Sequence, residues 1–189
     1  ADALFCGLAD ICLGTGSHAE VMAAIAGTRW GDAAGDNRAT LSRLLARHGA
    51  GSLPQSKLRQ HFDRINELMA GDDLLDIAAR LRGLRSDAPW LSAAAATFVK
   101  GSPTSAALAF ELWRRVPRLS LAEVFRLEYR ASLGCCAHAD FAEGIRALLI
   151  DKDRKPQWTP AALEQVIPEL IEDHFRPRFA AQHPLAALN

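Results

Sequence analysis

The sequence predicts a mainly α-helical fold with at most one or two short strands near the N-terminus. Apolar residues recur at helical spacing through most of the chain, and no stretch alternates apolar with polar residues as a half-buried strand would. Residues typical of helix N-termini also recur along the chain, and counting them with the helix breakers predicts roughly eight to ten helices.

Helix starts are indicated by pairs with capping-box spacing, in which side chain and backbone satisfy one another at a helix N-terminus. Three such pairs occur: Ser17 with Glu20, Ser120 with Glu123, and Asp140 with Glu143. Two further starts, Ser102-Pro103 and Thr159-Pro160, combine an N-cap residue with proline at the first helical position. We therefore expect five helices to begin at these positions.

Two more amphipathic helices are predicted from apolar spacing alone. One follows Gly71-Asp72 and one follows Asp36; their apolar positions are Leu74, Leu75, Ile77, Ala78, Leu81 and Leu84, and Leu41, Leu44 and Leu45. The best strand candidate is residues 9–13, which lie between Gly7 and the turn residues 14–16.

A connection is predicted at residues 49–54, where glycine, alanine, serine and proline favour irregular backbone. It divides the chain into an N-terminal region, residues 1–48, with a helix, a short strand and further helices, and a C-terminal helical region, residues 55–189. A chain of 189 residues is long enough for one good-sized domain or for half of a larger one.

The composition argues against several classes of partner and compartment. The formal net charge is zero and the basic residues form no block, so we expect neither nucleic acid nor a membrane surface as a partner. No apolar run approaches the roughly 20 residues that span a bilayer, and the N-terminus does not resemble a signal peptide. Cysteines without zinc-site spacing, two of them adjacent, point to a reducing compartment, so a cytoplasmic location is the default expectation.

No metal site or nucleophile motif is predicted. His61 with Asp63 and His138 with Asp140 are close pairings of histidine with a carboxylate, and neither has further ligands at metal-site intervals. Ser102 lies in no motif such as G-x-S-x-G, and helix capping accounts for it.

Four segments together resemble one enzyme family. They are residues 140–158 (DFAEGIRALLIDKDRKPQW), residues 101–105 (GSPTS), residues 125–132 (FRLEYRAS) and the first ten residues, ADALFCGLAD. These segments resemble the 3-hydroxyisobutyryl-CoA hydrolases, a branch of the crotonase (enoyl-CoA hydratase/isomerase) superfamily. The resemblance implies that the chain is the helical C-terminal part of a crotonase-like fold.

The resemblance implies an activity and a place for its chemistry. Family hydrolases cleave the thioester of 3-hydroxyisobutyryl-CoA in valine breakdown, using a Glu, an Asp and backbone N–H groups that form an oxyanion hole. In the family these groups precede the segment that the first ten residues resemble, and the chain begins with Ala1 inside a helix pattern. We therefore expect the C-terminal half of a longer protein, with no catalytic residue and no cofactor, in which acyl-CoA is the substrate and the assembly a homo-oligomer.

Four residues are candidates for contact with the CoA nucleotide, since the resemblance places this C-terminal segment near it. Lys152, flanked by Asp151, would reach a phosphate or the adenine end, and Trp158 and Phe141 would stack on adenine. The alternatives are structural: a solvated turn with lysine near a helix C-terminus, and aromatic rings that fill a core.

Two other functions stay open. One is an enoyl-CoA hydratase or isomerase of the same superfamily, and the other is a non-enzymatic helical module that binds a partner.

Overall fold

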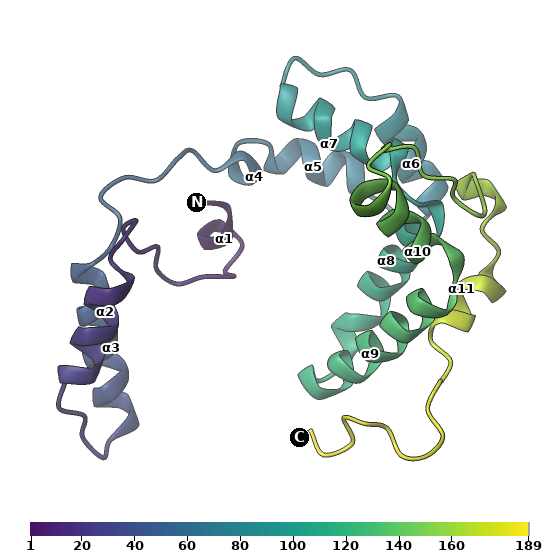
Figure 1. Cartoon of the computed structure of the whole chain (residues 1–189). Coiled ribbons are helices and arrows are strands. Elements are labelled where there is room, and N and C mark those ends of the chain that lie inside the picture. Colours follow the sequence, from purple (N-terminus) through teal and green to yellow (C-terminus); the bar gives the residue numbers. More distant parts are fainter. Residues whose placement is uncertain (189) are drawn as a thin grey trace. The chain divides into compact units, whose positions relative to one another are not determined.

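The computed structural model describes residues 1–188 and is mainly helical, as predicted (Figure 1). Eleven α-helices occur in these residues, compared with the eight to ten that were expected. Two of the eleven, α1 (Asp2–Phe5) and α4 (Lys57–Gln60), are single turns. The chain divides into two compact units, Ala1–Glu67 and Leu68–Asn189. The predicted connection at residues 49–54 is irregular and lies inside the first unit, and the predicted regions 1–48 and 55–189 stay a prediction.

The first unit contains a helical hairpin. Helices α2 (His18–Gly27) and α3 (Ala34–Arg47) pack against each other, and Val21 is the one buried apolar side chain that the structure describes in residues 1–67. The predicted strand at residues 9–13 is reduced to an isolated antiparallel bridge between Leu13 and Gly49 at the base of the hairpin. Only two backbone hydrogen bonds flank that bridge, so no ladder forms.

The first helix of this unit, α1, contacts the residues around α4. The Asp2 carboxylate accepts hydrogen bonds from the Ser56 hydroxyl at 2.6 Å and from the Leu58 N–H at 3.2 Å. These bonds lower the pKa of Asp2. The rings of Phe5 and Phe62 meet edge to face, with centroids 5.5 Å apart, so α1 lies against α4 and the start of α5 (Phe62–Met69).

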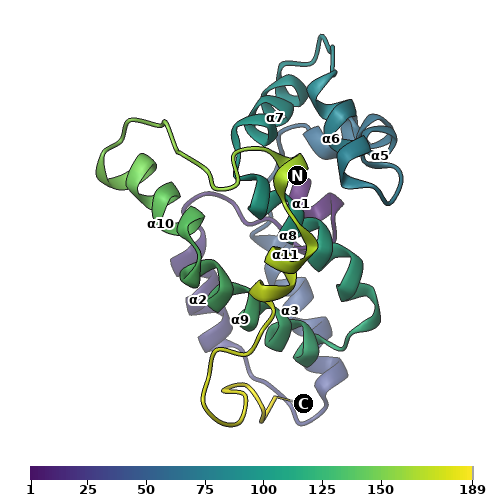
Figure 2. The ribbon, with the colours of Figure 1, turned by 90° about the vertical axis from the view of Figure 1, so that its right-hand side faces the viewer.

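The second unit is built from helices α6 (Leu74–Arg82), α7 (Pro89–Lys100), α8 (Pro103–Arg115), α9 (Leu121–Ala137), α10 (Ala139–Ile145) and α11 (Pro168–His174). One core cluster joins α8, α9 and the end of α11 through Leu108, Leu127, Ala131, Ile171 and Phe175. Figures 1 and 2 both show α8, α9 and α11 side by side.

Two of the predicted caps, at the starts of α8 and α9, are confirmed. Ser120 and Glu123 form the predicted capping box at the start of α9, and the Ser102 hydroxyl accepts a hydrogen bond from the Ser105 N–H at 3.0 Å at the start of α8. Ser17 does precede α2, but its hydroxyl donates to the Gly14 carbonyl, so the predicted box with Glu20 is absent.

One predicted helix start and one predicted cap are wrong. No α-helix begins at Thr159-Pro160, where the peptide bond is cis and only a single 3-10 turn, Leu163–Gln165, follows. A helix does begin near Asp140, as predicted, but Asp140 is not its cap, because α10 begins at Ala139 with His138 as its N-cap. One tertiary hydrogen bond links the two places: the Asp140 carboxylate accepts the Thr159 N–H instead of an N–H of its own helix.

Helices α9 and α11 approach closely at a glycine. A Cβ atom at Gly134 would lie 2.5 Å from the Cα and carbonyl oxygen of His174. His174 is 2% exposed, its Nδ1–H donates to the Leu170 carbonyl at 2.8 Å, and its ring stacks on that of His138 with centroids 4.2 Å apart. Burial is the main cause that lowers the pKa of His174, so the imidazole is held in its neutral form.

Candidate binding site

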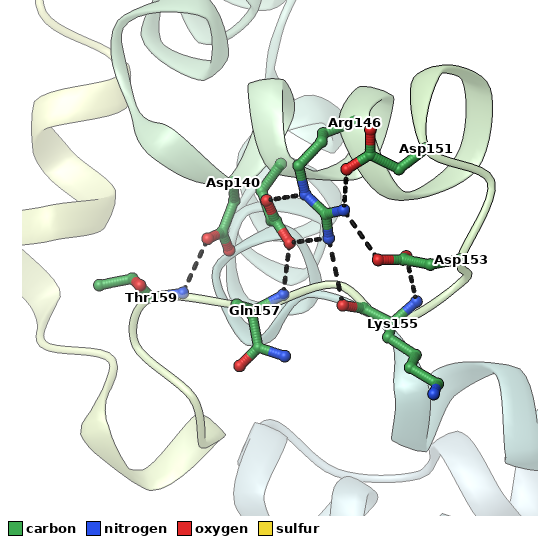
Figure 3. A network of polar contacts seen from close by, with 8 residues as sticks. Asp140, Arg146, Asp151, Asp153, Lys155, Gln157 and Thr159 are labelled. Atoms are coloured by element: carbon green, nitrogen blue, oxygen red, sulfur yellow. Dashed lines mark hydrogen bonds and ion pairs between the residues drawn. The ribbon is translucent and has the colours of Figure 1, made fainter.

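Arg146 organises the loop that follows α10. It opens a five-residue π-helix, Arg146–Ile150, and its guanidinium group donates to both carboxylate oxygens of Glu143 at 2.8 Å. It also contacts the carboxylates of Asp151 at 2.6 Å and Asp153 at 2.8 Å, and the carbonyl of Lys155 at 3.3 Å (Figure 3). One cation therefore holds both the helix end and the loop in place.

This contact strongly favours the ionised form of Glu143. The hydrogen bonds from Arg146, and a further one from the Gln157 N–H at 2.7 Å, lower the pKa of Glu143 from 4.5 to about 2. Because the folded value lies below the ordinary one, the contribution of Glu143 to stability is present above pH 4.5 and is lost as the pH falls from 4.5 towards 2.

We expect Arg146→Met to raise the pKa of Glu143 towards its ordinary value of 4.5, because the charged hydrogen-bond donor that holds the pKa low is gone. The loss of stability between pH 4.5 and 2 should become shallower. A carboxyl NMR titration measures the first effect and urea unfolding at several pH values the second. Arg154→Met is the control, and a Glu143 pKa that stays near 2 in Arg146→Met would contradict the assignment.

Asp140 ties the same loop to another helix from a buried position. Its Oδ2 accepts from the Ser102 hydroxyl at 2.5 Å and its Oδ1 accepts from the Thr159 N–H at 2.9 Å. Asp140 and Ser102 are each only 8% exposed. The side chain therefore joins α10, the N-terminus of α8 and the returning loop, which Figure 2 shows extending away from α10 before it comes back.

Trp158 lies between Gln157 and Thr159, whose N–H groups bond to Glu143 and Asp140, and it is also fixed by a hydrogen bond of its own. Its Nε1–H donates to the Lys100 carbonyl at the end of α7, at 2.9 Å. Its ring lies over Gly144, where a Cβ atom would be 3.5 Å from the indole. The indole is thus held in one orientation by α7 on one side and α10 on the other.

The loop of residues 151–159, which Arg146 and Asp140 hold in place, borders an open hollow of about 780 Å³. Apolar side chains form most of its wall, with Lys100 and Arg154 as the two cations among the described lining residues. Its lining residues are Thr97, Lys100, Gly101, Ser102, Ser105, Asp140, Phe141, Gly144, Ile145, Ala147, Leu148, Leu149, Arg154, Pro156 and Trp158. An apolar wall with a few fixed polar groups is the usual form of a ligand site.

The structure brings two of the four predicted site residues to this hollow. Phe141 and Trp158 both line it, and Phe141 is 53% exposed rather than packed in the core. Asp151 lies outside the lining and pairs with Arg146. Lys152 is exposed, has a left-handed backbone with φ +56°, and makes no hydrogen bond or ion pair within residues 1–188.

Sequence reasoning missed the residues that shape this site. Arg146 was not singled out, although the three carboxylates that it binds all lie within seven positions of it. Asp140 and Ser102 were both interpreted only as helix caps. No sequence motif pointed to Lys100 or Arg154. Within residues 1–188 no group of three or more His, Cys, Asp or Glu side chains could hold a metal ion.

Comparison with known proteins identifies the family. A family model described as Enoyl-CoA hydratase/isomerase matches residues 1–175. The chain belongs to the enoyl-CoA hydratase/isomerase family. The resemblance drawn from the four sequence motifs is therefore confirmed.

Two solved structures of the family resemble the chain over 94% of its length. A carnitinyl-CoA dehydratase from Mycobacterium thermoresistibile matches with a TM-score of 0.74 and 32% identity, and an enoyl-CoA hydratase from Rhodobacter sphaeroides with 0.71 and 31%. The chain covers 47% of each of these proteins.

Curated relatives point to one branch of the enoyl-CoA hydratase/isomerase family. The mitochondrial 3-hydroxyisobutyryl-CoA hydrolase of Gallus gallus is 38% identical over 120 residues, which is 64% of this chain and 31% of that protein. The Danio rerio enzyme of the same name is 36% identical over 118 residues. The chain thus spans about a third of these relatives. Both are named as mitochondrial, so the cytoplasmic location stays a prediction; no helix within residues 1–188 is long and apolar enough to cross a membrane.

Proposed function

We propose that this chain forms part of an acyl-CoA thioester hydrolase that acts on 3-hydroxyisobutyryl-CoA in valine degradation. The observation that carries the proposal is the segment 140–158. It bears the hydrolase-like sequence motif, and it is also the segment that Arg146 and Asp140 fix beside the hollow. The names of the curated relatives support the same branch.

The hollow suits the nucleotide end of CoA by its chemistry. Phe141 and Trp158 present aromatic surface on which adenine stacks, and the neighbouring cations Lys100 and Arg154 would pair with phosphate groups. In this proposal Lys152 reaches a phosphate from the exposed loop, and Asp151 acts by holding that loop on Arg146. We assign no catalytic residue and no cofactor to the chain, whose part is to bind the acyl-CoA substrate.

We also propose that the protein works as a homo-oligomer. Leu148 and Leu149, at the edge of the hollow, are 62% and 63% exposed, and apolar surface of this kind favours association. Light scattering that shows a clean monomer would argue against this part of the proposal.

The activity is tested by release of free CoA from 3-hydroxyisobutyryl-CoA, detected with a thiol reagent. We expect release by the longest encoded polypeptide that contains this sequence and none by the 189-residue chain alone, because the residues named here bind but do not react. Activity of the 189-residue chain alone would overturn that assignment, and Glu128, Asp151 and Lys152 would be the first residues to replace.

Matched tryptophan variants of the longer polypeptide test the binding role. Trp158→Ala should raise the KM for acyl-CoA by about tenfold, because base–aromatic stacking contributes about 1–3 kcal/mol. Trp113→Ala, a change at a tryptophan that is 61% exposed on α8 and outside the hollow, should leave KM unchanged. Equal KM values for the two variants would remove Trp158 from the site.

A hydratase or isomerase of the same family is the second candidate, since the two solved structures are a dehydratase and a hydratase by name. Such an enzyme would consume or rearrange an enoyl-CoA without releasing the thiol. Turnover of acyl-CoA without release of free CoA would therefore favour this candidate. If neither the 189-residue chain nor the longer polypeptide bound or turned over acyl-CoA, a non-enzymatic helical module would be favoured.

A further inference from the structure

The C-terminal segment lies beyond the family match and is nevertheless docked on the second unit. The family match ends at residue 175, and residues 176–188 contain no helix or strand. No residue of the segment is buried, yet it runs back beside α9, as Figure 1 shows in yellow. Its attachment therefore depends on a few polar and aromatic contacts rather than on a core.

Arg126 holds the end of this segment by its main chain. The guanidinium group donates to the carbonyl oxygens of Leu185 at 3.0 Å and Ala186 at 3.2 Å, and to that of Leu188. Guanidinium groups have five donors and no acceptor. Arg126 thus binds the segment through backbone carbonyls that would turn to water if the segment left α9.

His183 holds the segment through both of its ring nitrogens. Nε2–H donates to the Arg126 carbonyl at 3.1 Å, while Nδ1 accepts the Leu185 N–H at 3.0 Å. The ring also packs edge-on against Tyr129 and Phe179, with centroids 5.4 and 4.9 Å apart. Only a neutral imidazole with its proton on Nε2 can make both hydrogen bonds at once.

Protonation of His183 would break this arrangement. A proton on Nδ1 would face the Leu185 N–H instead of accepting it, and the new charge would lie near the Arg126 guanidinium group. On α9 the ring of Tyr129 also faces His183, while Glu123 interacts with Arg126 and is bonded to Ser120 at the N-cap. No carboxylate contacts His183 in residues 1–188 to compensate the charge.

We propose that residues 176–188 form a strap on α9 that is latched by neutral His183 and released by its protonation. Release uncovers the donors of Arg126 and the ring of Tyr129 on α9. Histidine is suited to such a latch because its charge changes within about pH 5 to 8. Segments with few buried contacts also open at little free-energy cost, which makes a single ring sufficient to control this one.

The test is amide hydrogen exchange of residues 185, 186 and 188 in the whole chain, corrected for the intrinsic effect of pH. We expect protection at pH 7.5 to fall about tenfold at pH 5.5, the effect of losing one hydrogen bond. The amides of Leu127 and Ala131 in the core of α9 serve as the internal reference and should stay protected.

Three variants distinguish a latch from a general acid effect. Arg126→Met should remove protection at both pH values, whereas Arg118→Met, at an exposed arginine, should behave like the unchanged protein. His183→Gln keeps a donor for the Arg126 carbonyl but cannot be protonated, so its protection should no longer depend on pH. Protection that survives Arg126→Met, or a pH effect that persists in His183→Gln, would overturn the proposal.

Discussion

Replacing Gly134 by alanine should destabilise the second unit by about 2–3 kcal/mol. In the interior of a helix this change normally stabilises by about 1 kcal/mol. Here the new Cβ would lie 2.5 Å from the Cα and carbonyl oxygen of His174, which are backbone atoms and cannot rotate away. Helix α11 would have to shift from α9, which would disturb the core around Ile171 and Phe175.

Thermal unfolding measures this effect, and Tm should fall by about 5–10 °C. Gly144→Ala is the matched control, because it lies in helix α10 and its new Cβ would meet only the Trp158 ring, at an ordinary 3.5 Å. We expect Gly144→Ala to be neutral or stabilising by up to about 1 kcal/mol. Equal Tm values for the two variants would mean that α9 and α11 are not in close contact at Gly134.

Replacing Asp140 by alanine should cost about 2–3 kcal/mol of stability, because the change leaves two buried or half-buried donors without their acceptor. The Ser102 hydroxyl and the Thr159 N–H would both lose a carboxylate partner. The loop that carries Trp158 would then lose one attachment and keep those through Arg146, the Gln157 N–H and the Trp158 indole. Urea unfolding at pH 7 gives the free energy.

Asp72→Ala is the control for this change, since Asp72 is an exposed turn residue outside the site. It should alter the free energy of unfolding by less than about 0.5 kcal/mol. The double variant Ser102→Ala with Asp140→Ala should cost less than the sum of the single changes, because the two side chains share one hydrogen bond. Additive costs would show that the two residues act independently.

Much of the helical order follows from chemistry that is local in the sequence. The N-cap of α8 at Ser102 and the capping box of α9 at Ser120 each link groups only three residues apart. The apolar spacing after Gly71-Asp72 likewise predicts α6, which begins at Leu74. Such signals are complete within one turn of helix, so the sequence alone suffices to find them.

The site shows where this reasoning stops. Phe141 and Trp158 were predicted as a pair and do line one hollow, whereas Asp151 and Lys152 lie outside it. Asp140 has the spacing of a cap but serves Ser102, which is 38 positions away, and Thr159, which is 19 away. A carboxylate that can bond a neighbouring N–H or a distant hydroxyl gives the same sequence pattern in either case.

The sequence by itself determined the helical class, the main helix starts and the family, because these depend on local hydrogen bonding and on motifs within single segments. Only the tertiary structure decided that Arg146 gathers three carboxylates, that Gly134 admits the backbone of α11, and that the C-terminal segment returns to Arg126. These features depend on which distant groups meet after the helices pack, and no spacing along the chain encodes that meeting.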